Sequence, residues 1–169
     1  LFYCLYGRGF DSLRLHYYTP RAQCFRVFVF LVVGQVVGNS FKFAKKLTKA
    51  LRREKHSVGL KSLNNYCVFP KAKKFLVLTS TYGDGEAPFN ANDFERLFAD
   101  LVQPYPIDYS ILGFGSKSYP KFCQFAITLE ALFEKKLNFN ELTPLFKINN
   151  QSETDYLIWE KTIINKLKT

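Results

Sequence analysis

The chain alternates between short apolar runs and segments in which apolar residues recur every three or four positions. Runs of about four to nine residues that are rich in Val, Leu, Ile and Phe are typical of buried β-strands. The pattern predicts five strands, at residues 25–33, 57–63, 75–79, 109–114 and 142–148. Residues 57–63 are the weakest of these strand candidates.

The segments between these strands have the periodicity of amphipathic helices. In residues 41–55 the apolar positions fall at i, i+4, i+7 and i+8, which gives one buried stripe with lysines opposite. This stripe consists of Phe43, Leu47, Ala50 and Leu51, and Ser40 stands where an N-cap is expected. Similar stripes predict helices at residues 91–102, 122–137 and 156–167. Pro104 and Pro106 end the first of these three helices.

Apolar strands that alternate with amphipathic helices imply a parallel sheet covered on both faces. A chain of 169 residues with 47% apolar composition fills one such domain and leaves little for a second core. We therefore predict a single five-stranded α/β sandwich over residues 25–169. Residues 1–24 show no useful periodicity, and we assign them no structure. They are either a linker from a preceding domain or a sequence translated from a shifted reading frame. The lack of methionine and the start at Leu1 indicate a fragment of a longer product.

The net charge of +10 is concentrated in one part of the chain. Residues 25–79 contain twelve Lys and Arg residues against Glu54 alone, whereas residues 80–169 contain nine against twelve acidic residues. Many of the basic residues fall on the predicted helix 41–55, where they indicate a solvated face; a surface for nucleic acid or a membrane is the alternative. We do not expect nucleic acid binding, because the most informative loop lies in the acidic half. No run of eighteen apolar residues indicates a membrane span in this fragment.

The cysteines and histidines do not indicate a metal site. None of the cysteines has C-x-x-C spacing, and two histidines are too few for a zinc site of the usual kind. These residues are Cys4, Cys24, Cys67, Cys123, His16 and His56. Buried, reduced thiols are the simplest interpretation, and they favour a cytoplasmic location, with membrane attachment through missing segments left open.

The most informative segment is residues 80–89, which directly follow the apolar run 75–78. This segment contains hydroxyl side chains, two glycines and an exposed aromatic residue, Tyr82. A strand that ends in such a loop can wrap backbone N–H groups around a flat anionic ligand. Ligands of open parallel sheets bind beyond the carboxyl ends of the strands. We therefore expect a cofactor site at residues 34–40, 80–90 and 113–123, the loops after the first, third and fourth strands.

Two of these loops resemble a known family. Residues 80–91 read STYGDGEAPFNA, and residues 112–125 read LGFGSKSYPKFCQF. They resemble the second and third flavin loops of the FMN domain of diflavin reductases, which include the sulfite reductase flavoprotein, the NADPH-dependent cytochrome reductases and the reductase half of nitric oxide synthase. The resemblance covers about residues 34–169. It implies a flavodoxin-like three-layer α/β sandwich with strand order 2-1-3-4-5, and one noncovalently bound FMN.

The resemblance also implies a role for each loop. Tyr82 and Tyr119 would stack on opposite faces of the isoalloxazine ring with their hydroxyls in water; the alternative is that each is an ordinary loop or core aromatic. Gly83 and Gly85 would let the backbone approach the ring and change conformation. Contacts to the ring and ribityl chain are implied for Ser80, Thr81, Tyr82, Gly83, Asp84, Gly85, Phe114, Gly115, Ser116, Lys117, Ser118, Tyr119, Phe122 and Cys123. Phosphate contacts are implied for Gln35, Val36, Val37, Gly38, Asn39 and Ser40.

Three of these loop residues have two interpretations each. Asp84 and Glu86 either lower the potential of the flavin and present an acidic face to a redox partner, or are ordinary polar residues of a solvated loop. Cys123 is either a structural thiol, which we favour, or a redox-active one. No side chain is assigned a catalytic role, because the reactive chemistry belongs to the cofactor.

The first loop departs from the family pattern. The family has approximately Gly-Ser-x-Thr-Gly-Asn there, whereas this chain has Gln35 and Val37 in place of the two hydroxyl residues. Each lost bond to phosphate costs about 1.5 to 3 kcal/mol, so FMN affinity falls by roughly two to four orders of magnitude. Backbone N–H groups and the start of the following helix can still hold a phosphate. The loop is either truly altered or the product of a frame change upstream of Gly38.

The sequence therefore predicts an FMN domain that passes single electrons from an FAD- and NADPH-binding reductase module to a heme or metalloprotein acceptor. Such a domain has no hydride transfer of its own with NADPH, because the chain has no counterpart of that module. The alternative is a degenerate flavodoxin-like interaction domain without flavin. A third interpretation is an anion-binding role for helix 41–55.

Overall fold

The computed structural model describes residues 28–34, 39–65 and 72–168. Its parallel sheet has the strand order β2-β1-β3-β4-β5, and a further strand, β6, also pairs with β4. The strands are β1 (Phe28–Val33), β2 (Ser57–Ser62), β3 (Lys74–Ser80), β4 (Ile107–Gly115), β5 (Phe139–Glu141) and β6 (Phe146–Asn149). This order confirms the predicted parallel α/β topology.

The fifth position of the sheet differs from the prediction. A single strand was expected at residues 142–148, but β5 pairs with Ile107–Tyr109 and β6 pairs with Leu112–Gly115. The chain leaves the sheet between them, where Pro144 has no N–H to donate. Thr143 and Ser110 share a buried hydroxyl hydrogen bond of 2.6 Å, which ties this detour to β4.

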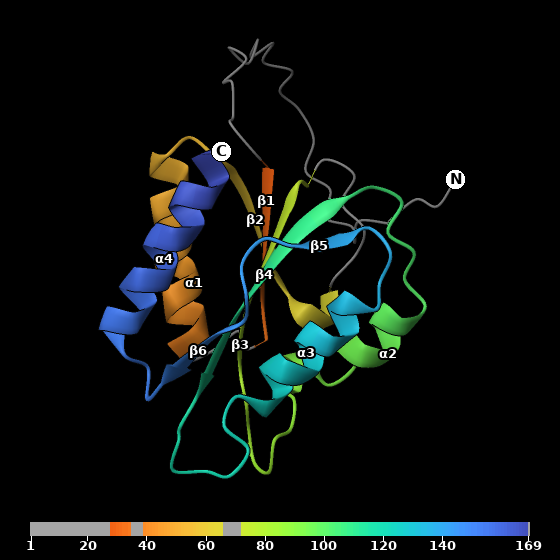
Figure 1. Cartoon of the computed structure of the whole chain (residues 1–169), viewed down its shortest axis with the longest axis vertical. Coiled ribbons are helices and arrows are strands. Elements are labelled where there is room, and N and C mark those ends of the chain that lie inside the picture. Colours follow the sequence, from red (N-terminus) through yellow and green to blue (C-terminus); the bar gives the residue numbers. More distant parts are fainter. Residues whose placement is uncertain (1–27, 35–38, 66–71, 169) are drawn as a thin grey trace, which may run out of the picture.

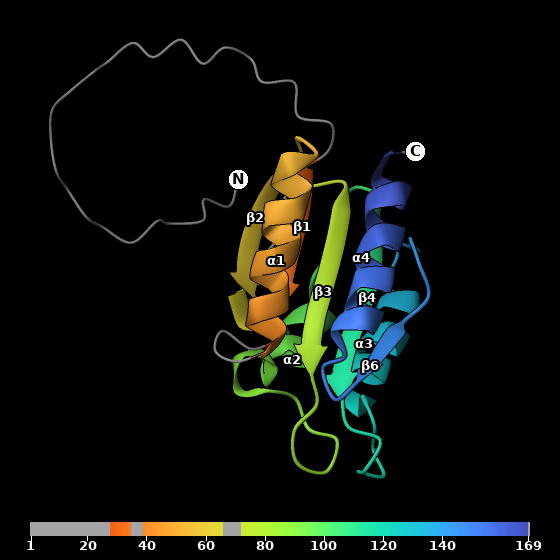
Figure 2. The same ribbon diagram turned by 90° about the vertical axis from the view of Figure 1, so that its left-hand side faces the viewer.

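The helices pack on both faces of the sheet (Figures 1 and 2). α1 (Asn39–Arg53) and α4 (Glu153–Lys168) cover one face, and α2 (Phe94–Ala99) and α3 (Gln124–Glu134) cover the other. Two short 3-10 helices, η1 (Leu63–Asn65) and η2 (Phe89–Ala91), lie on the connections before and after β3. The result is the three-layer sandwich that the pattern predicts.

All four helices differ from their predicted bounds. Ser40 is not an N-cap, because α1 already begins at Asn39. Helix 91–102 is reduced to six residues, and Lys136 Nζ binds the carbonyl oxygens of Ala99 and Leu101 at 2.6 and 3.0 Å where the helix has ended. Helix 122–137 begins only at Gln124, since Cys123 has a left-handed φ of 55° that does not continue a helix.

Alternation along the strands builds a core on each face of the sheet. On β3, Phe75 and Val77 pack toward α2 and α3, while Leu76 and Leu78 pack toward α1 and α4. All four side chains are fully buried. No helix within the described residues is long and apolar enough to cross a membrane.

Phe133 of α3 is the centre of the aromatic packing on one face. Its ring lies 4.9 to 6.1 Å, between centroids, from five other aromatic rings. These belong to Phe75, Phe94, Phe98, Tyr109 and Phe139. Phe133 therefore joins α2, α3, β3, β4 and β5 in one cluster.

We expect Phe133→Ala to lower the free energy of unfolding by about 3 to 5 kcal/mol, because the rigid rings around the missing side chain move too little to fill the cavity. Urea unfolding followed by circular dichroism measures this change. Leu137→Ala is the control, since Leu137 is 83% exposed and its truncation should change stability by less than about 0.5 kcal/mol. Equal effects of the two variants would contradict the central role of Phe133.

Candidate functional site

Two adjoining pockets, of about 300 and 280 Å³, lie beyond the carboxyl ends of β3 and β4. They share a common wall, made of Thr81, Tyr82, Gly115, Ser116 and Tyr119. The larger pocket extends to Ser40, Ser80, Phe114, Asn150 and Gln151, and the smaller one to Gly83, Lys121 and Cys123. The pockets thus lie where an open parallel sheet places its ligands.

The register of β3 and β4 explains why these loops meet. Ser80 pairs with Phe114 at the last position of the ladder, so both strands end at the same level. Thr81 N–H then donates to Phe114 O at 3.2 Å, and Phe125 N–H donates to Thr81 Oγ1 at 3.2 Å. Thr81 therefore fixes the second loop to both ends of the third.

Tyr82 and Tyr119 stand on these two loops. Both line both pockets, and their side chains remain 43% and 66% exposed. The alternative of a core aromatic is therefore excluded for each. An aromatic ring that is half in water beside a pocket has a free face on which a flat ligand can stack.

The predicted site residues as a whole divide into three groups. Ten of them line the pockets: Ser40, Ser80, Thr81, Tyr82, Gly83, Phe114, Gly115, Ser116, Tyr119 and Cys123. Asp84, Gly85, Lys117, Ser118 and Phe122 are not among the lining residues of either pocket. Residues 35–38, predicted to hold phosphate, lie outside the described residues, as do residues 1–24, and only the backbone of Asn39 is described.

Two of the residues outside the pockets still shape the third loop. Lys117 N–H donates to Asn149 Oδ1 at 2.8 Å, and Ser118 N–H donates to Ser116 Oγ at 3.2 Å. Tyr119 N–H donates to Ser116 O at 3.1 Å, which closes a turn around these residues. Lys117 and Ser118 thus hold the backbone that presents Tyr119.

The loop after β6 forms a wall that the sequence analysis missed. Asn150 and Gln151 line the larger pocket, and both have left-handed φ values, of 47° and 58°. Asn150 N–H donates to Gly115 O at 2.9 Å, which anchors this loop to the end of β4. The Asn-Asn pair at the end of an apolar strand was the available signal, because Asn tolerates this conformation well.

Ser40 is a polar residue of α1 that faces this site. Its side chain is 1% exposed, it lines the larger pocket, and its Oγ atom has no hydrogen-bond partner among the residues that the structure describes. A buried hydroxyl without a partner is costly, at about 1 to 3 kcal/mol. Its place in the first turn of a helix, where N–H groups and the helix dipole favour anions, fits a phosphate group.

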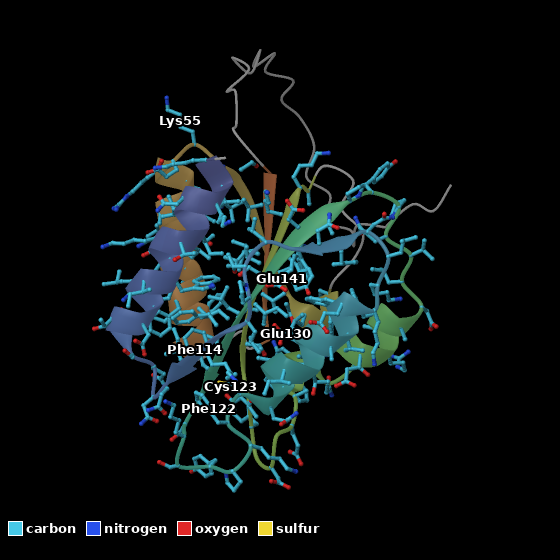
Figure 3. All side chains as sticks on the ribbon, in the orientation of Figure 1. Lys55, Phe114, Phe122, Cys123, Glu130 and Glu141 are labelled. Atoms are coloured by element: carbon cyan, nitrogen blue, oxygen red, sulfur yellow. The ribbon has the colours of Figure 1, made fainter. Side chains whose placement is uncertain are left out.

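Glycines at the end of β4 allow α3 to approach the site. A Cβ atom on Gly113 would lie 2.7 Å from Ala126 Cβ, and one on Gly115 would lie 3.0 Å from Cys123 N. The two positions therefore have no space for a side chain. In Figure 3, Phe122 and Cys123 are labelled at this end of β4, where they lie beside Gly115, whereas Phe114 packs on Phe43 of α1 on the opposite face of the sheet.

Cys123 has the environment of a structural thiol. Its side chain is fully buried, and burial raises the pKa of the thiol to about 11, with Lys147 opposing only part of the rise. The thiolate is the reactive form of cysteine, so this environment suppresses its reactivity. The structural interpretation is thus favoured over a redox role.

We expect native Cys123 to resist iodoacetamide at pH 8, since a pKa of about 11 leaves about one thiolate in a thousand there. Because the fold favours the neutral thiol, Cys123 stabilises the folded state fully below the ordinary pKa of a cysteine thiol, about 9. This stabilisation is lost as the pH rises through the folded-state pKa of about 11. Peptide-resolved mass spectrometry measures the labelling. Urea-unfolded protein is the control, and equally fast labelling of Cys123 in both states would contradict this picture.

Comparisons with known proteins agree with this geometry. The flavodoxin family model matches residues 36–159. The sulfite reductase [NADPH] flavoprotein alpha-component of Shewanella sp. strain ANA-3 is 29% identical over 154 residues, which cover 89% of this chain and 25% of that protein. NADPH oxidoreductase A of Dictyostelium discoideum is 31% identical over 112 residues, which cover 63% of this chain and 18% of that protein.

The solved structures agree in fold. The TIGR4 flavodoxin of Streptococcus pneumoniae superposes with a TM-score of 0.72 at 24% identity, over 84% of this chain and 98% of that one. The chain spans about a quarter of the length of the first of the curated relatives above. Because the family model matches most of the chain, the chain belongs to the flavodoxin family.

Proposed function

We propose that residues 25–169 form an FMN-binding electron-transfer domain, the FMN module of a diflavin reductase. The observation that carries this proposal is the pair of half-exposed tyrosines, Tyr82 and Tyr119, on two loops around one pocket. FMN, when bound, supplies one-electron redox chemistry, and the protein supplies position and electrostatics.

The pocket offers a separate environment for each part of FMN. Tyr82 and Tyr119 would hold the isoalloxazine ring, and the polar wall of Ser116, Asn150 and Gln151 would face its edge and the ribityl chain. The phosphate would lie at the first turn of α1, where the buried hydroxyl of Ser40 has no partner within the described part of the chain. Ser40 thus offers one hydroxyl at the start of α1, directly after a loop in which Gln35 and Val37 stand in place of the two hydroxyl residues of the family pattern.

The proposed electron donor is an FAD- and NADPH-binding reductase module. The names of the relatives support this, since they are NADPH-dependent reductases of which this chain matches a minor part. The proposed acceptor is a heme or metalloprotein. Exposure of both tyrosines would leave the ring edge open to these partners. The buried, protonated thiol of Cys123 suits a reducing compartment such as the cytoplasm.

A second candidate function follows from the altered phosphate loop. If Gln35 and Val37 abolish FMN binding, the same fold remains as an interaction domain without flavin. The third interpretation, an anion-binding α1, is weakened by Glu153, which lies 2.6 Å from Lys46 Nζ and 3.6 Å from Lys42 Nζ. Two of the basic residues of this helix are therefore paired with a carboxylate.

We expect the purified domain to bind FMN with quenching of flavin fluorescence, and Gln35→Ser combined with Val37→Thr to tighten binding by about 100-fold or more. The reason is that each restored hydroxyl adds a bond to a charged phosphate. Fluorescence titration measures both dissociation constants. A protein that stays colourless with excess FMN, even after both substitutions, would support the interaction domain instead.

We expect Ser40→Ala to have opposite effects on stability and on binding. Without FMN it should raise the free energy of unfolding by about 1 kcal/mol, because a buried hydroxyl without a partner is removed. It should weaken FMN binding by about tenfold, as a bond to phosphate is lost. Urea unfolding and fluorescence titration measure the two effects.

Thr48→Ala is the matched control for Ser40→Ala. Thr48 is a buried hydroxyl of the same helix, but its Oγ1 already donates to Ala44 O at 2.8 Å. Its loss should not stabilise the protein and should leave FMN affinity unchanged. Weaker FMN binding by both variants alike would argue against a phosphate site at Ser40.

A further inference from the structure

The turn that carries Tyr82 closes on itself. Tyr82 N–H donates to Glu86 O at 3.0 Å, and the N–H groups of Gly85 and Glu86 donate to Tyr82 O at 3.0 and 2.8 Å. Gly83 and Gly85, with φ values of 48° and 97°, form the tip of the turn together with Asp84. These backbone hydrogen bonds all lie within the turn, so they do not attach the tip of the turn to the third loop.

One ion pair connects this tip to the third loop. Lys121 Nζ lies 2.8 Å from Asp84 Oδ2 across 37 residues of sequence. In the part of the chain that the structure describes, it is the one polar contact from residues 83–85 to another segment. Thr81 anchors the start of this loop, and Lys121 provides the polar anchor of its tip.

The alkyl stem of Lys121 adds a second contact to the same tip. A Cβ atom on Gly85 would lie 2.9 Å from Lys121 Cδ and 3.1 Å from Gln124 Cγ, so the stem packs directly against the glycine backbone. Lys121 also lines the smaller pocket together with Tyr82 and Tyr119. One side chain therefore touches the turn, the third loop and the cavity between them.

We propose that Lys121 is a positioning residue for the flavin ring. Through Asp84 it holds the turn 82–86 against the third loop and so sets the spacing of Tyr82 and Tyr119. This inference rests on the proposed FMN function and assigns Lys121 a role that the cofactor loops alone do not imply. An exposed ion pair of this kind contributes little stability, so its loss should weaken FMN binding by no more than about twofold to fivefold.

Lys121 also decides which carboxylate of the turn carries a free charge. Asp84 faces the ammonium group of Lys121 in an exposed ion pair, whereas Glu86 folds back so that its Oε2 would lie 2.9 Å from a Cβ on Gly83. Among the described residues Glu86 has no ion-pair partner within 4 Å. A free carboxylate close to the ring disfavours added electrons, because like charges repel. The two carboxylates therefore provide a matched comparison within one turn.

The test is a double-mutant cycle of Lys121→Met and Asp84→Asn, with FMN affinity and flavin midpoint potential as readouts. Each single variant should weaken FMN binding by about twofold to fivefold, and the double variant should be no weaker than either. The midpoint potential should fall in Lys121→Met, which frees the Asp84 charge, and rise in Asp84→Asn, which removes it. A loss of folding stability alone would not shift the midpoint potential in opposite directions in these two variants.

Glu86→Gln in the same cycle with Lys121→Met is the matched control. Its effects should add to those of Lys121→Met without coupling, because Lys121 is paired with Asp84 and not with Glu86. The difference between wild type and Lys121→Met should vanish in 1 M NaCl, where charges are screened within about 3 Å.

Each outcome of this test is informative. Equal coupling of Lys121 to Asp84 and to Glu86, or an unchanged affinity and potential in Lys121→Met, would overturn the positioning role while FMN binding by the wild type stands. A wild type that binds no FMN, even with the restored hydroxyls at positions 35 and 37, overturns both the proposed function and the role of Lys121.

Discussion

Parallel pairing between β3 and β4 is the constraint on which the site depends. Parallel strands end at the same edge of a sheet, and the register of Ser80 with Phe114 brings the second and third loops to one level. β6 extends this arrangement, because Phe114 pairs with Ile148 and Gly115 with Asn149. The loops after β3, β4 and β6, which are distant in sequence, therefore meet because of strand pairing alone, and no ligand is needed to bring them together. The pocket is a consequence of the sheet, and the loops only complete it.

Packing on the helical side sets how closely the third loop can approach. Gly113 and Gly115 leave no room for a side chain, so α3 rests directly on the end of β4. The left-handed conformation of Cys123 then starts α3 two residues later than its apolar stripe suggests. The extra residues stay in the loop that presents Tyr119. The same contacts bury the Cys123 thiol and raise its pKa, so inertness of this cysteine follows from the geometry of the loop.

The site also contains several features that ordinarily reduce the stability of a folded protein. Ser40 has a buried hydroxyl that finds no partner in residues 39–65 and 72–168 or in β1, and Asn150 and Gln151 are consecutive left-handed residues. Such features are retained where the surrounding structure fixes them and a ligand can use them. The apolar clusters on both faces of the sheet, with Phe133 and Trp159 among their buried members, supply the rigidity that holds these residues in place. The residues of the pocket therefore lie in the loops at one edge of the sheet, whereas the residues that stabilise the fold lie in the two apolar clusters.

The sequence by itself determined the parallel α/β topology, the two flavin-type loops and the exposed tyrosines. Short apolar runs, a period of 3.6 and turn-forming residues are local properties that a single chain displays directly. Only the tertiary structure decided the split of the fifth strand, the start of α3 at Gln124, the orphaned hydroxyl of Ser40, the wall of Asn150 and Gln151, and the pairing of Lys121 with Asp84. Each of these depends on contacts between residues far apart in sequence. No local pattern encodes such contacts, because register, burial and ion pairing are set when the elements pack together.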